Sequence, residues 1–389
     1  MEILSERFAP GQKVDIYFSI KNQEIDNVDF GFTTRYHLAP TTYTERLANN
    51  KNMKAIIRTG DGGPEVLHLG DAPTPQPTET QLLVDVHVTA LNRADLVQRR
   101  GGYPPPPGES EILGLEIAGT VAAMGSAVTG WTEGDKVFGL IGGGGYAEQA
   151  VIDYRMAMRI PDGWSFEHAA AVPEVFFTAN ENIFTLGRLS AGETILIHAG
   201  GSGVGSAGVQ IAHRAGARVF VTAGTATKIA GCETLGATAG INYKTADFVA
   251  EIQRLTNGEG VDVVLDFIGA PYLARNLAIL KTWGRLLQVG LIGGSTTEID
   301  LGTVMRKRLK LIGSVMRPQS LEEKIRITRR FVERWLPALK AGTLQPVIDT
   351  VFPLAQASEA HAYMEANRNF GKILLFCPGA KRTDTLVGP

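Results

Sequence analysis

The fold is decided by residues 195–205, which read ILIHAGGSGVG. An apolar strand runs directly into a glycine-rich loop, and the following residues, 206–214, have the apolar spacing of a helix. In such a turn, backbone amides can approach a pyrophosphate and the start of the helix supplies partial positive charge. Counted from Gly200 in the pattern G-x-G-x-x-G, Gly205 fits and Ser202 replaces the middle glycine. The stretch therefore predicts a dinucleotide site.

The same alternation continues on both sides of this loop. Apolar strands alternate with helical segments, such as 226–235 and 247–255, throughout residues 173–313. The six expected strands are 194–199, 218–223, 239–243, 261–268, 285–291 and 309–315. Right-handed crossovers between parallel strands leave few other topologies. We therefore predict an α/β fold with a Rossmann domain, that is, a doubly wound parallel sheet.

The end of the second expected strand indicates which dinucleotide is bound. An NAD site usually has an Asp or Glu about 20 residues after the glycine loop, where it bonds the ribose 2′-hydroxyl. This chain has Ala223, Gly224 and Thr225 there, followed by Lys228, which can neutralise a 2′-phosphate. We predict NADPH as the cofactor. The alternative is that Lys228 is only a solvated lysine on a helix.

Residues 53–172 have a different periodicity. Alternation of period two predicts short strands at 82–90, 117–122 and 136–140. The run 103–108, YPPPPG, must be a stiff surface loop, because proline fixes φ and lacks a backbone donor. The segment is expected to form a partly closed antiparallel β-barrel that holds the substrate.

The chain returns to this barrel after the Rossmann domain. A long helix is expected at 321–341, followed by strand-like pieces at 347–353 and 372–376, so residues 314–378 are expected to complete the substrate domain. Two end segments remain: an N-terminal extension expected to be poorly ordered, 1–52, and a C-terminal tail, 379–389.

Composition excludes several classes of function. The formal net charge is −2, so no charge excess favours a nucleic acid or a membrane surface. The longest apolar runs are far shorter than the ~18 residues of a membrane helix. Cys232 and Cys377 are too few for a disulfide framework or a tetrathiolate zinc site. They allow a single bridge, but a reduced, cytoplasmic setting is expected.

Four spaced motifs resemble one enzyme family. They are NRADL (92–96), YPPPPG (103–108), GLEIAG (114–119) and HAGGSGVG (198–205). In this order they resemble the zinc-independent quinone oxidoreductases of the medium-chain dehydrogenase/reductase superfamily, and most of all the p53-inducible-gene-type quinone reductases. The resemblance covers residues 53 to about 377. It implies a GroES-like substrate domain beside the Rossmann domain.

The resemblance also implies that no metal is bound. Related zinc alcohol dehydrogenases have a cysteine before the Asp of the first motif and G-H-E in the third, whereas this chain has Asn92 and Leu115 at those positions. Glu174 aligns with the third ligand. An amide, a leucine and one carboxylate do not supply the roughly three N, S or O ligands of a catalytic zinc.

The family pattern implies which residues hold the cofactor: the loop at the pyrophosphate, the next two strands at the 2′-phosphate, and strand ends at the nicotinamide. The expected cofactor-binding residues are Gly200, Ser202, Gly203, Val204, Gly205, Gly224, Lys228, Tyr243, Gly269, Gly290 and Lys372. Asn92 and Tyr103 are the expected catalytic residues. The alternatives are that Tyr243 is an ordinary strand aromatic, that Gly269 and Gly290 are turn glycines, and that Tyr103 packs on the proline run.

These residues restrict the reaction. Without a metal as Lewis acid, hydride must go to an acceptor that is already activated, such as a quinone or an enone. We predict an NADPH-dependent quinone oxidoreductase in which Tyr103 donates a hydrogen bond to the developing oxyanion. The alternatives are a 2-enoyl-thioester or alkene reductase, and an NADPH-binding protein with little catalysis.

The last expected Rossmann strand, 309–315 (LKLIGSV), leaves one edge of the sheet open. An apolar edge without proline is an aggregation hazard unless something covers it. Pairing with the same strand of a second copy about a two-fold axis satisfies the edge, so we predict a homodimer. The alternative is that a loop or helix of the same chain covers the strand.

Overall fold

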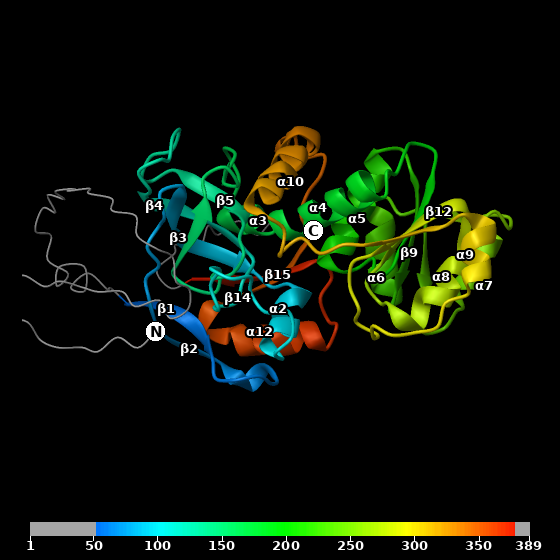
Figure 1. Ribbon diagram of the computed structural model, residues 1–389, viewed down its shortest axis with the longest axis horizontal. Coiled ribbons are helices and arrows are strands. Elements are labelled where there is room, and N and C mark those ends of the chain that lie inside the picture. The colour runs from blue at the N-terminus through cyan, green and yellow to red at the C-terminus, as the bar shows by residue number, and fades with distance from the viewer. Residues whose placement is uncertain (1–51, 378–389) are drawn as a thin grey trace, which may run out of the picture. The chain divides into compact units, whose positions relative to one another are not determined.

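The computed structural model describes residues 52–377. The expectations for residues 1–51 and 379–389 lie outside this range. Within it the strands form a six-stranded sheet, a seven-stranded sheet and a two-stranded ribbon (Figure 1). The ribbon pairs β1 (Asn52–Arg58) with β2 (Leu67–Pro73), and the short helix η1 (Pro64–Val66) precedes β2.

The six-stranded sheet is parallel throughout, with the strand order β10-β9-β8-β11-β12-β13. Its strands are β8 (Thr194–Ile197), β9 (Arg218–Ala223), β10 (Ala239–Asn242), β11 (Val261–Asp266), β12 (Leu280–Gln288) and β13 (Lys310–Gly313). Its helices are α5 (Gly203–Arg214), α6 (Ala226–Thr234), α7 (Phe248–Leu255), η3 (Ala270–Tyr272), α8 (Leu273–Ile279) and α9 (Leu301–Lys307). The order reverses between β8 and β11, and ligands of such sheets bind at this reversal. The predicted doubly wound Rossmann fold is confirmed.

The seven-stranded sheet combines early strands with the last two strands of the described chain. Its strands are β3 (Gln81–Ala90), β4 (Glu116–Met124), β5 (Lys136–Leu140), β6 (Gln149–Asp153), β7 (Met158–Arg159), β14 (Ile348–Pro353) and β15 (Lys372–Phe376). One side of β3 pairs with β4, and its other side pairs with β6 and then with β15. This branching curves the sheet, as the expected partly closed barrel requires.

Residues 53–172 contain helices as well as the predicted strands, and these helices were not predicted from the sequence. The additional helices are α2 (Arg93–Arg99) and α3 (Phe166–Ala170), and α4 (Pro173–Asn180) follows directly and continues into a π-helical turn, η2 (Glu181–Leu186). Helix α2 begins with a capping box between Asn92 and Asp95. Both helices are too short to show helical periodicity, but the capping residues were visible in the sequence.

The predicted helix 321–341 is two helices. Helix α10 (Leu321–Arg334) ends before Trp335, and α11 (Leu336–Lys340) has Pro337 in its first turn. Proline removes an amide donor and collides with the preceding turn, so a continuous helix is broken there. The last helices, η4 (Leu354–Gln356) and α12 (Ala357–Glu365), connect β14 to β15.

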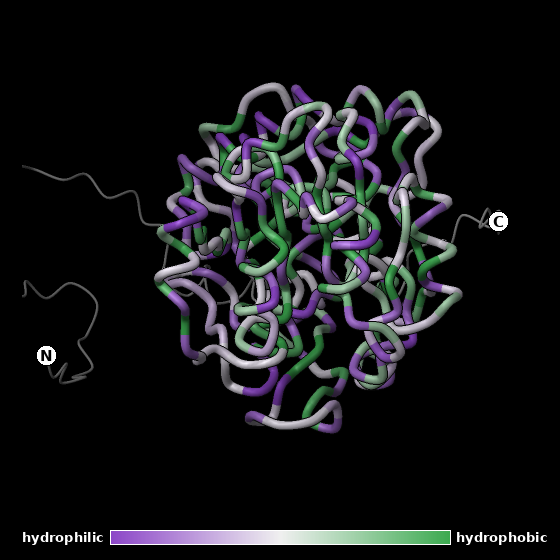
Figure 2. Tube along the Cα trace, turned by 90° about the vertical axis from the view of Figure 1, so that its right-hand side faces the viewer, coloured by the Kyte–Doolittle hydropathy of each residue, from purple (hydrophilic) through white to green (hydrophobic). Residues whose placement is uncertain are grey.

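The largest hydrophobic core includes residues of both sheets and the helices between them. Phe176 on α4, Ile197 on β8 and Phe331 on α10 are each fully buried in it. In Figure 2 the apolar segments run through the middle of the trace. Cys232 and Cys377 are both buried and unbridged. None of the helices between residues 52 and 377 could span a membrane.

Candidate functional site

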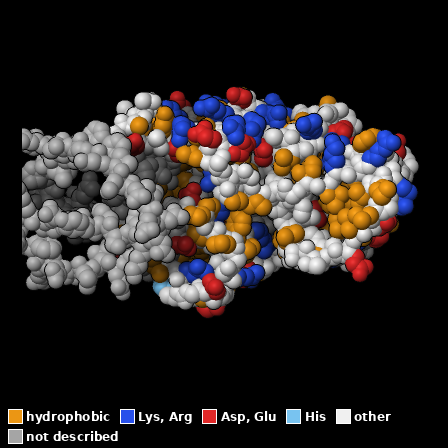
Figure 3. Space-filling view, viewed as in Figure 1, with side chains coloured by type: hydrophobic (Ala, Val, Ile, Leu, Met, Phe, Trp, Pro, Cys, Tyr) orange, Lys and Arg blue, Asp and Glu red, His pale blue; other side chains and the backbone are white. Residues whose placement is uncertain are grey.

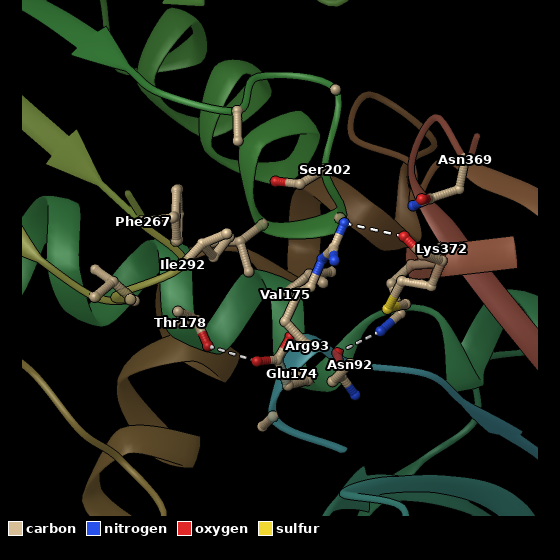
Figure 4. A pocket seen from close by; sticks show the side chains of 18 of the residues that line it. Asn92, Arg93, Glu174, Val175, Thr178, Ser202, Phe267, Ile292, Asn369 and Lys372 are labelled. Carbon is tan, nitrogen blue, oxygen red and sulfur yellow. Dashed lines mark hydrogen bonds between the residues drawn. The ribbon is translucent and has the colours of Figure 1, made fainter. Parts of the chain in front are cut away.

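Residues from both large sheets line a pocket of about 1530 Å³. One wall consists of the loops after β8, β9 and β11, and the opposite wall includes residues beside α2, the start of α4 and β15 (Figure 4). Pockets for drug-sized ligands measure roughly 300–1,000 Å³. This one has room for a dinucleotide and a second molecule.

The glycine loop after β8 leads into the N-terminus of α5 at the pocket wall. Ser202 caps α5: its Oγ accepts a hydrogen bond from the Gly205 amide at 3.0 Å, and its carbonyl accepts one from Ser206 at 2.8 Å. The Val204 amide has no partner among the described residues, as is usual in a first helical turn, whereas the Gly203 amide lies in the isolated parallel bridge between Ser202 and Gly371. The start of such a helix favours an anion.

The glycines of this loop have different roles. Gly203 lines the pocket, and a Cβ there would meet Val175 at 2.8 Å and the Lys372 stem at 2.9 Å. Gly200 and Gly205 lie behind the loop, away from the pocket wall. A Cβ on Gly205 would stand 2.4 Å from the Ala199 carbonyl oxygen. These two glycines therefore allow close packing of strand and helix, as glycine does in such turns.

A positively charged corner lies beside the end of β9. Gly224, Lys228 and Tyr243 all line it, as predicted from the sequence, and a Cβ on Gly224 would meet the Tyr243 hydroxyl at 2.8 Å. Lys228 Nζ donates to the Asn367 carbonyl at 2.7 Å. Burial lowers the pKa of Lys228, Asp349 opposes this shift, and Arg93 and Lys244 lower the pKa further. An anion in this corner would relieve the mutual repulsion of the three cations.

Lys244 and Arg93 are pocket residues that sequence reasoning missed. Lys244 directly follows Tyr243, so the end of the third Rossmann strand was the available signal. Arg93 begins α2 and reaches across to the end of α12 and the segment after it, where it donates to the Met364 carbonyl at 3.1 Å and to Asn367 (Figure 4). No local pattern predicts this contact, because its partners are more than 270 positions away.

The two strand-end glycines predicted beside the nicotinamide differ in position. Gly290 lines the pocket together with Phe267, whereas Gly269 does not. Gly269 has φ +87°, and Asp266 accepts its amide at 3.2 Å. Gly269 thus shapes the turn that presents Phe267.

A buried cluster of Asn92, Glu116 and Lys372 lies beneath the pocket. Lys372 Nζ donates to the Leu91 carbonyl at 2.8 Å, to Asn92 Oδ1 at 2.6 Å and to Glu116 Oε1 at 2.7 Å (Figure 4). Asn92 Nδ2 also donates to Glu116 Oε1, at 2.9 Å. Since an ammonium has three donors, all of those of Lys372 are used. If Lys372 contacts the cofactor as predicted, the contact is made by its aliphatic side-chain carbons beside Gly203 and not by its ammonium.

Asn92 is held by a second group of buried side chains. The Asp95 carboxylate accepts hydrogen bonds from the backbone amides of Asn92 at 2.7 Å and Gly114 at 3.2 Å. It also accepts one from the Tyr146 hydroxyl at 3.1 Å. The Tyr146 hydroxyl also lies 3.2 Å from His361 Nε2. Burial raises the pKa of Asp95 to about 6 despite these bonds. This arrangement fixes the turn from which Asn92 faces the pocket.

Tyr103 lines the pocket from the loop before the four prolines. It has φ +53°, and Arg317 lies over its ring and donates to its carbonyl at 3.0 Å. Its hydroxyl has no hydrogen bond to any residue within 52–377. Burial raises the pKa of this phenol. The hydroxyl is therefore a neutral donor that remains free for a ligand.

Glu174, at the start of α4, is the titratable carboxyl in the pocket wall closest to Asn92 in Figure 4. Thr178 Oγ1 donates to its Oε1 at 3.4 Å. Burial raises the pKa of this carboxyl to about 7, and Lys372 partly opposes the shift. Sequence reasoning considered Glu174 only as a metal ligand, because its burial was not visible in the sequence.

Comparison with known proteins identifies the family. The alcohol dehydrogenase GroES-like domain model matches residues 78–162, and the zinc-binding dehydrogenase model matches residues 203–331. The quinone oxidoreductase of the rat, Rattus norvegicus, is 31% identical over 328 residues, which cover 84% of this chain and 98% of the rat protein. This chain belongs to the quinone oxidoreductase family. The family lies within the medium-chain dehydrogenase/reductase superfamily.

Solved structures agree with this quinone oxidoreductase assignment. The Escherichia coli quinone oxidoreductase complexed with NADPH has a TM-score of 0.76 and 28% identity, and the match covers 83% of this chain and 99% of that chain. The CurK enoyl reductase has a TM-score of 0.73 and 28% identity, with 84% and 100% coverage. The structural neighbours therefore include an enoyl reductase as well as a quinone oxidoreductase.

The zinc in the name of the family model does not fit the donors that this chain provides. Asn92 Oδ1 already accepts the Lys372 ammonium, and Leu115 is a buried apolar side chain. Among the residues that the structure describes, no three His, Cys, Asp or Glu side chains are placed to hold a metal ion. The cation of this cluster is the fixed Lys372 ammonium, and the cluster does not fit zinc.

Proposed function

We propose that this protein transfers a hydride from NADPH to a quinone or a similarly activated enone. The protein is an NADPH-dependent oxidoreductase of the quinone oxidoreductase family. The observation that carries the finer proposal is the Asn92–Glu116–Lys372 cluster, because its ammonium replaces a Lewis acid and cannot coordinate a substrate oxygen. An unactivated alcohol or ketone needs a Lewis acid or a well-placed proton donor, whereas a quinone accepts a hydride without metal coordination.

The residues around the pocket fit NADPH. The loop of Ser202 and Gly203 and the free amide of Val204 would hold the pyrophosphate, and Lys228, Lys244 and Tyr243 would surround the 2′-phosphate. Bound NADPH supplies the hydride from its nicotinamide ring. The part of the chain in the opposite wall then orients the acceptor and donates hydrogen bonds to the oxygen that becomes negative.

Asn92 and Tyr103 are the proposed acceptor-facing residues. The Asn92 carbonyl oxygen and amide nitrogen are bonded within the cluster, so its role is to hold the local geometry. The Tyr103 hydroxyl is free and uncharged at neutral pH, and it can donate to the developing oxyanion. A hydrogen bond of this kind typically accelerates a reaction by about 10²–10³-fold.

A second candidate function is the reduction of 2-enoyl thioesters or other alkenes. It is favoured by Glu174 and Tyr103, two protonatable groups in one pocket, because alkene reduction requires a proton on carbon. The likeness to the CurK enoyl reductase points the same way.

The experiment is an NADPH-oxidation screen across ortho-quinones, enones and enoyl thioesters, with NADH measured in parallel. Turnover of quinones or enones with NADPH is the expected result. Turnover of enoyl thioesters together with inert quinones would establish the second candidate. Binding of NADPH without turnover of any acceptor would show that the protein is a cofactor-binding protein with little catalysis.

We also propose that two copies pair through β13. The strand is the last in the sheet order, and Lys310, Leu311 and Gly313 are exposed. Apolar side chains gather at the nearby α8–α9 end of the molecule (Figure 3). The exposed large apolar residues of this region include Leu291, Ile292, Ile299, Leu301, Met305 and Leu311. Patches of this kind mark interaction surfaces.

A further inference from the structure

Reduction of an activated acceptor consumes a proton as well as a hydride. The hydride brings two electrons and one hydrogen to the acceptor, which becomes an enolate or a hydroquinone anion. A neutral product then needs one further proton from an acid within reach. On the proposed function, a residue in the pocket wall must therefore be this acid.

Glu174 is placed to be the acid. It lies at the start of α4 in the pocket wall, near Asn92 (Figure 4). The one hydrogen bond to its carboxyl from residues 52–377 is the long contact from Thr178 Oγ1 to Oε1 at 3.4 Å. The side chain is half-buried, and its remaining exposure faces the pocket. A carboxyl with an open oxygen on the pocket side can reach a bound molecule.

The charges around Glu174 make the protonated form accessible. Glu116 on β4 and Asp95 on α2 are carboxylates that raise its pKa, and Lys372 on β15 lowers it. The Lys372 ammonium is already bonded to Glu116, so it neutralises that carboxylate first. The other ionisable groups in this part of the wall are Tyr103, Arg93, Arg317 and Lys324. Burial is the largest cause of the shift to a pKa of about 7.

Tyr103 is less suited to supply the proton. Burial raises the pKa of its phenol above the ordinary value of 10, so proton release at neutral pH is unfavourable. An acid whose pKa lies near the working pH combines a populated protonated form with a sufficient driving force. Tyr103 can therefore donate a hydrogen bond while another group gives the proton.

We propose that Glu174 is the catalytic acid of this enzyme and gives its proton to the acceptor after hydride transfer. The O–H bond of the Glu174 carboxyl breaks, and a new bond forms between that proton and the oxygen or the α-carbon of the reduced acceptor. Glu174 becomes a carboxylate. A solvent proton restores it after product release, so each cycle consumes one NADPH, one acceptor and one proton.

The test measures kcat against pH with an enone, because protonation at carbon is slow enough to be observed. In the wild type, kcat should be constant below about pH 7 and fall about tenfold per pH unit above it, because the acid is then deprotonated. A flat wild-type profile from about pH 5.5 to 9 would overturn the proposal without any variant.

Glu174→Gln keeps the size of the side chain and an oxygen that accepts the hydrogen bond from Thr178, but the amide cannot give a proton. We expect kcat for the enone to fall by about 10²–10⁴-fold and to become independent of pH, with the NADPH Kd unchanged. Glu181→Gln is the matched control, since Glu181 follows α4 outside the pocket and pairs with Arg330. This control should keep the wild-type pH profile.

Chemical rescue separates acid catalysis from a structural role. Added imidazole should restore enone reduction in Glu174→Ala, because its imidazolium form is an acid near neutral pH, whereas added acid cannot repair a packing defect. Glu174→Gln with wild-type kcat at all pH values would refute the proposal and leave the quinone reductase function intact. Absence of turnover by the wild type with every acceptor would instead refute the proposed function.

Discussion

Replacement of Lys372 by methionine tests the cluster that takes the place of a metal. Lys372 is 2% exposed and Glu116 is fully buried, and their side chains meet at 2.7 Å. Methionine keeps an unbranched apolar stem beside Gly203 but removes all three Nζ hydrogen bonds. Glu116 then keeps the donors from Asn92 and from the Glu174 amide at 2.8 Å, but its charge has no cation.

The expected destabilisation is large. Removal of one partner from a buried ion pair costs about 3–5 kcal/mol, because the other charge stays buried without compensation. A 1 kcal/mol change moves Tm by roughly 2 °C in a chain of this size, so Tm should fall by about 6–10 °C. In the double variant Glu116→Gln with Lys372→Met the unpaired charge is gone, and at least ~2 kcal/mol, or about 4 °C, should be regained.

Differential scanning fluorimetry measures these changes, with NADPH binding as a second readout. Lys54→Met is the control, because the Lys54–Asp71 pair is exposed on both sides and its loss should leave Tm unchanged. A fall in Tm below about 2 °C for Lys372→Met, or a double variant no more stable than this single one, would refute the reasoning. A rise of more than about tenfold in the NADPH Kd with an unchanged Tm would show that the ammonium contacts the cofactor directly.

Three further outcomes are expected. Lys228→Ala should raise the NADPH KM by roughly tenfold to a hundredfold, because a charged hydrogen bond contributes about 1.5–3 kcal/mol. The NADH KM should stay almost unchanged. An equal rise in KM for both cofactors would place Lys228 away from the 2′-phosphate. Metal analysis of the purified protein should find no stoichiometric zinc, and a chelator should leave activity intact; one zinc per chain, lost together with activity, would contradict the ligand argument at Asn92, Leu115 and Glu174. Ile312→Pro should yield monomeric or insoluble protein, because proline in β13 disrupts the strand; wild type that is monomeric in light scattering at micromolar concentration would disprove the dimer.

The Rossmann half of the protein could be predicted from local sequence patterns. Each buried parallel strand is a short apolar run, and each crossover helix has its own apolar face. The predicted strand 218–223 therefore corresponds to β9 residue for residue, and the predicted strand 194–199 begins with β8 but extends two residues beyond its end. NADPH as the cofactor was also predictable, because the glycine in place of an acidic residue at Gly224 and the nearby Lys228 lie within one short segment. The break at Trp335 was missed, although Pro337 was a sufficient signal for it.

Tertiary structure alone decided what lies around the reacting groups. Lys372 and Glu116 are 256 positions apart, and their pairing follows from β15 joining β3 and from β3 joining β4. The same folding partly buries the Glu174 carboxyl and so raises its pKa, and it turns Gly200 and Gly205 away from the pocket. Strands and turns depend on neighbours a few residues away, which a sequence displays directly. Burial and charge pairing depend on distant segments, and their partners are defined only when the sheets have formed.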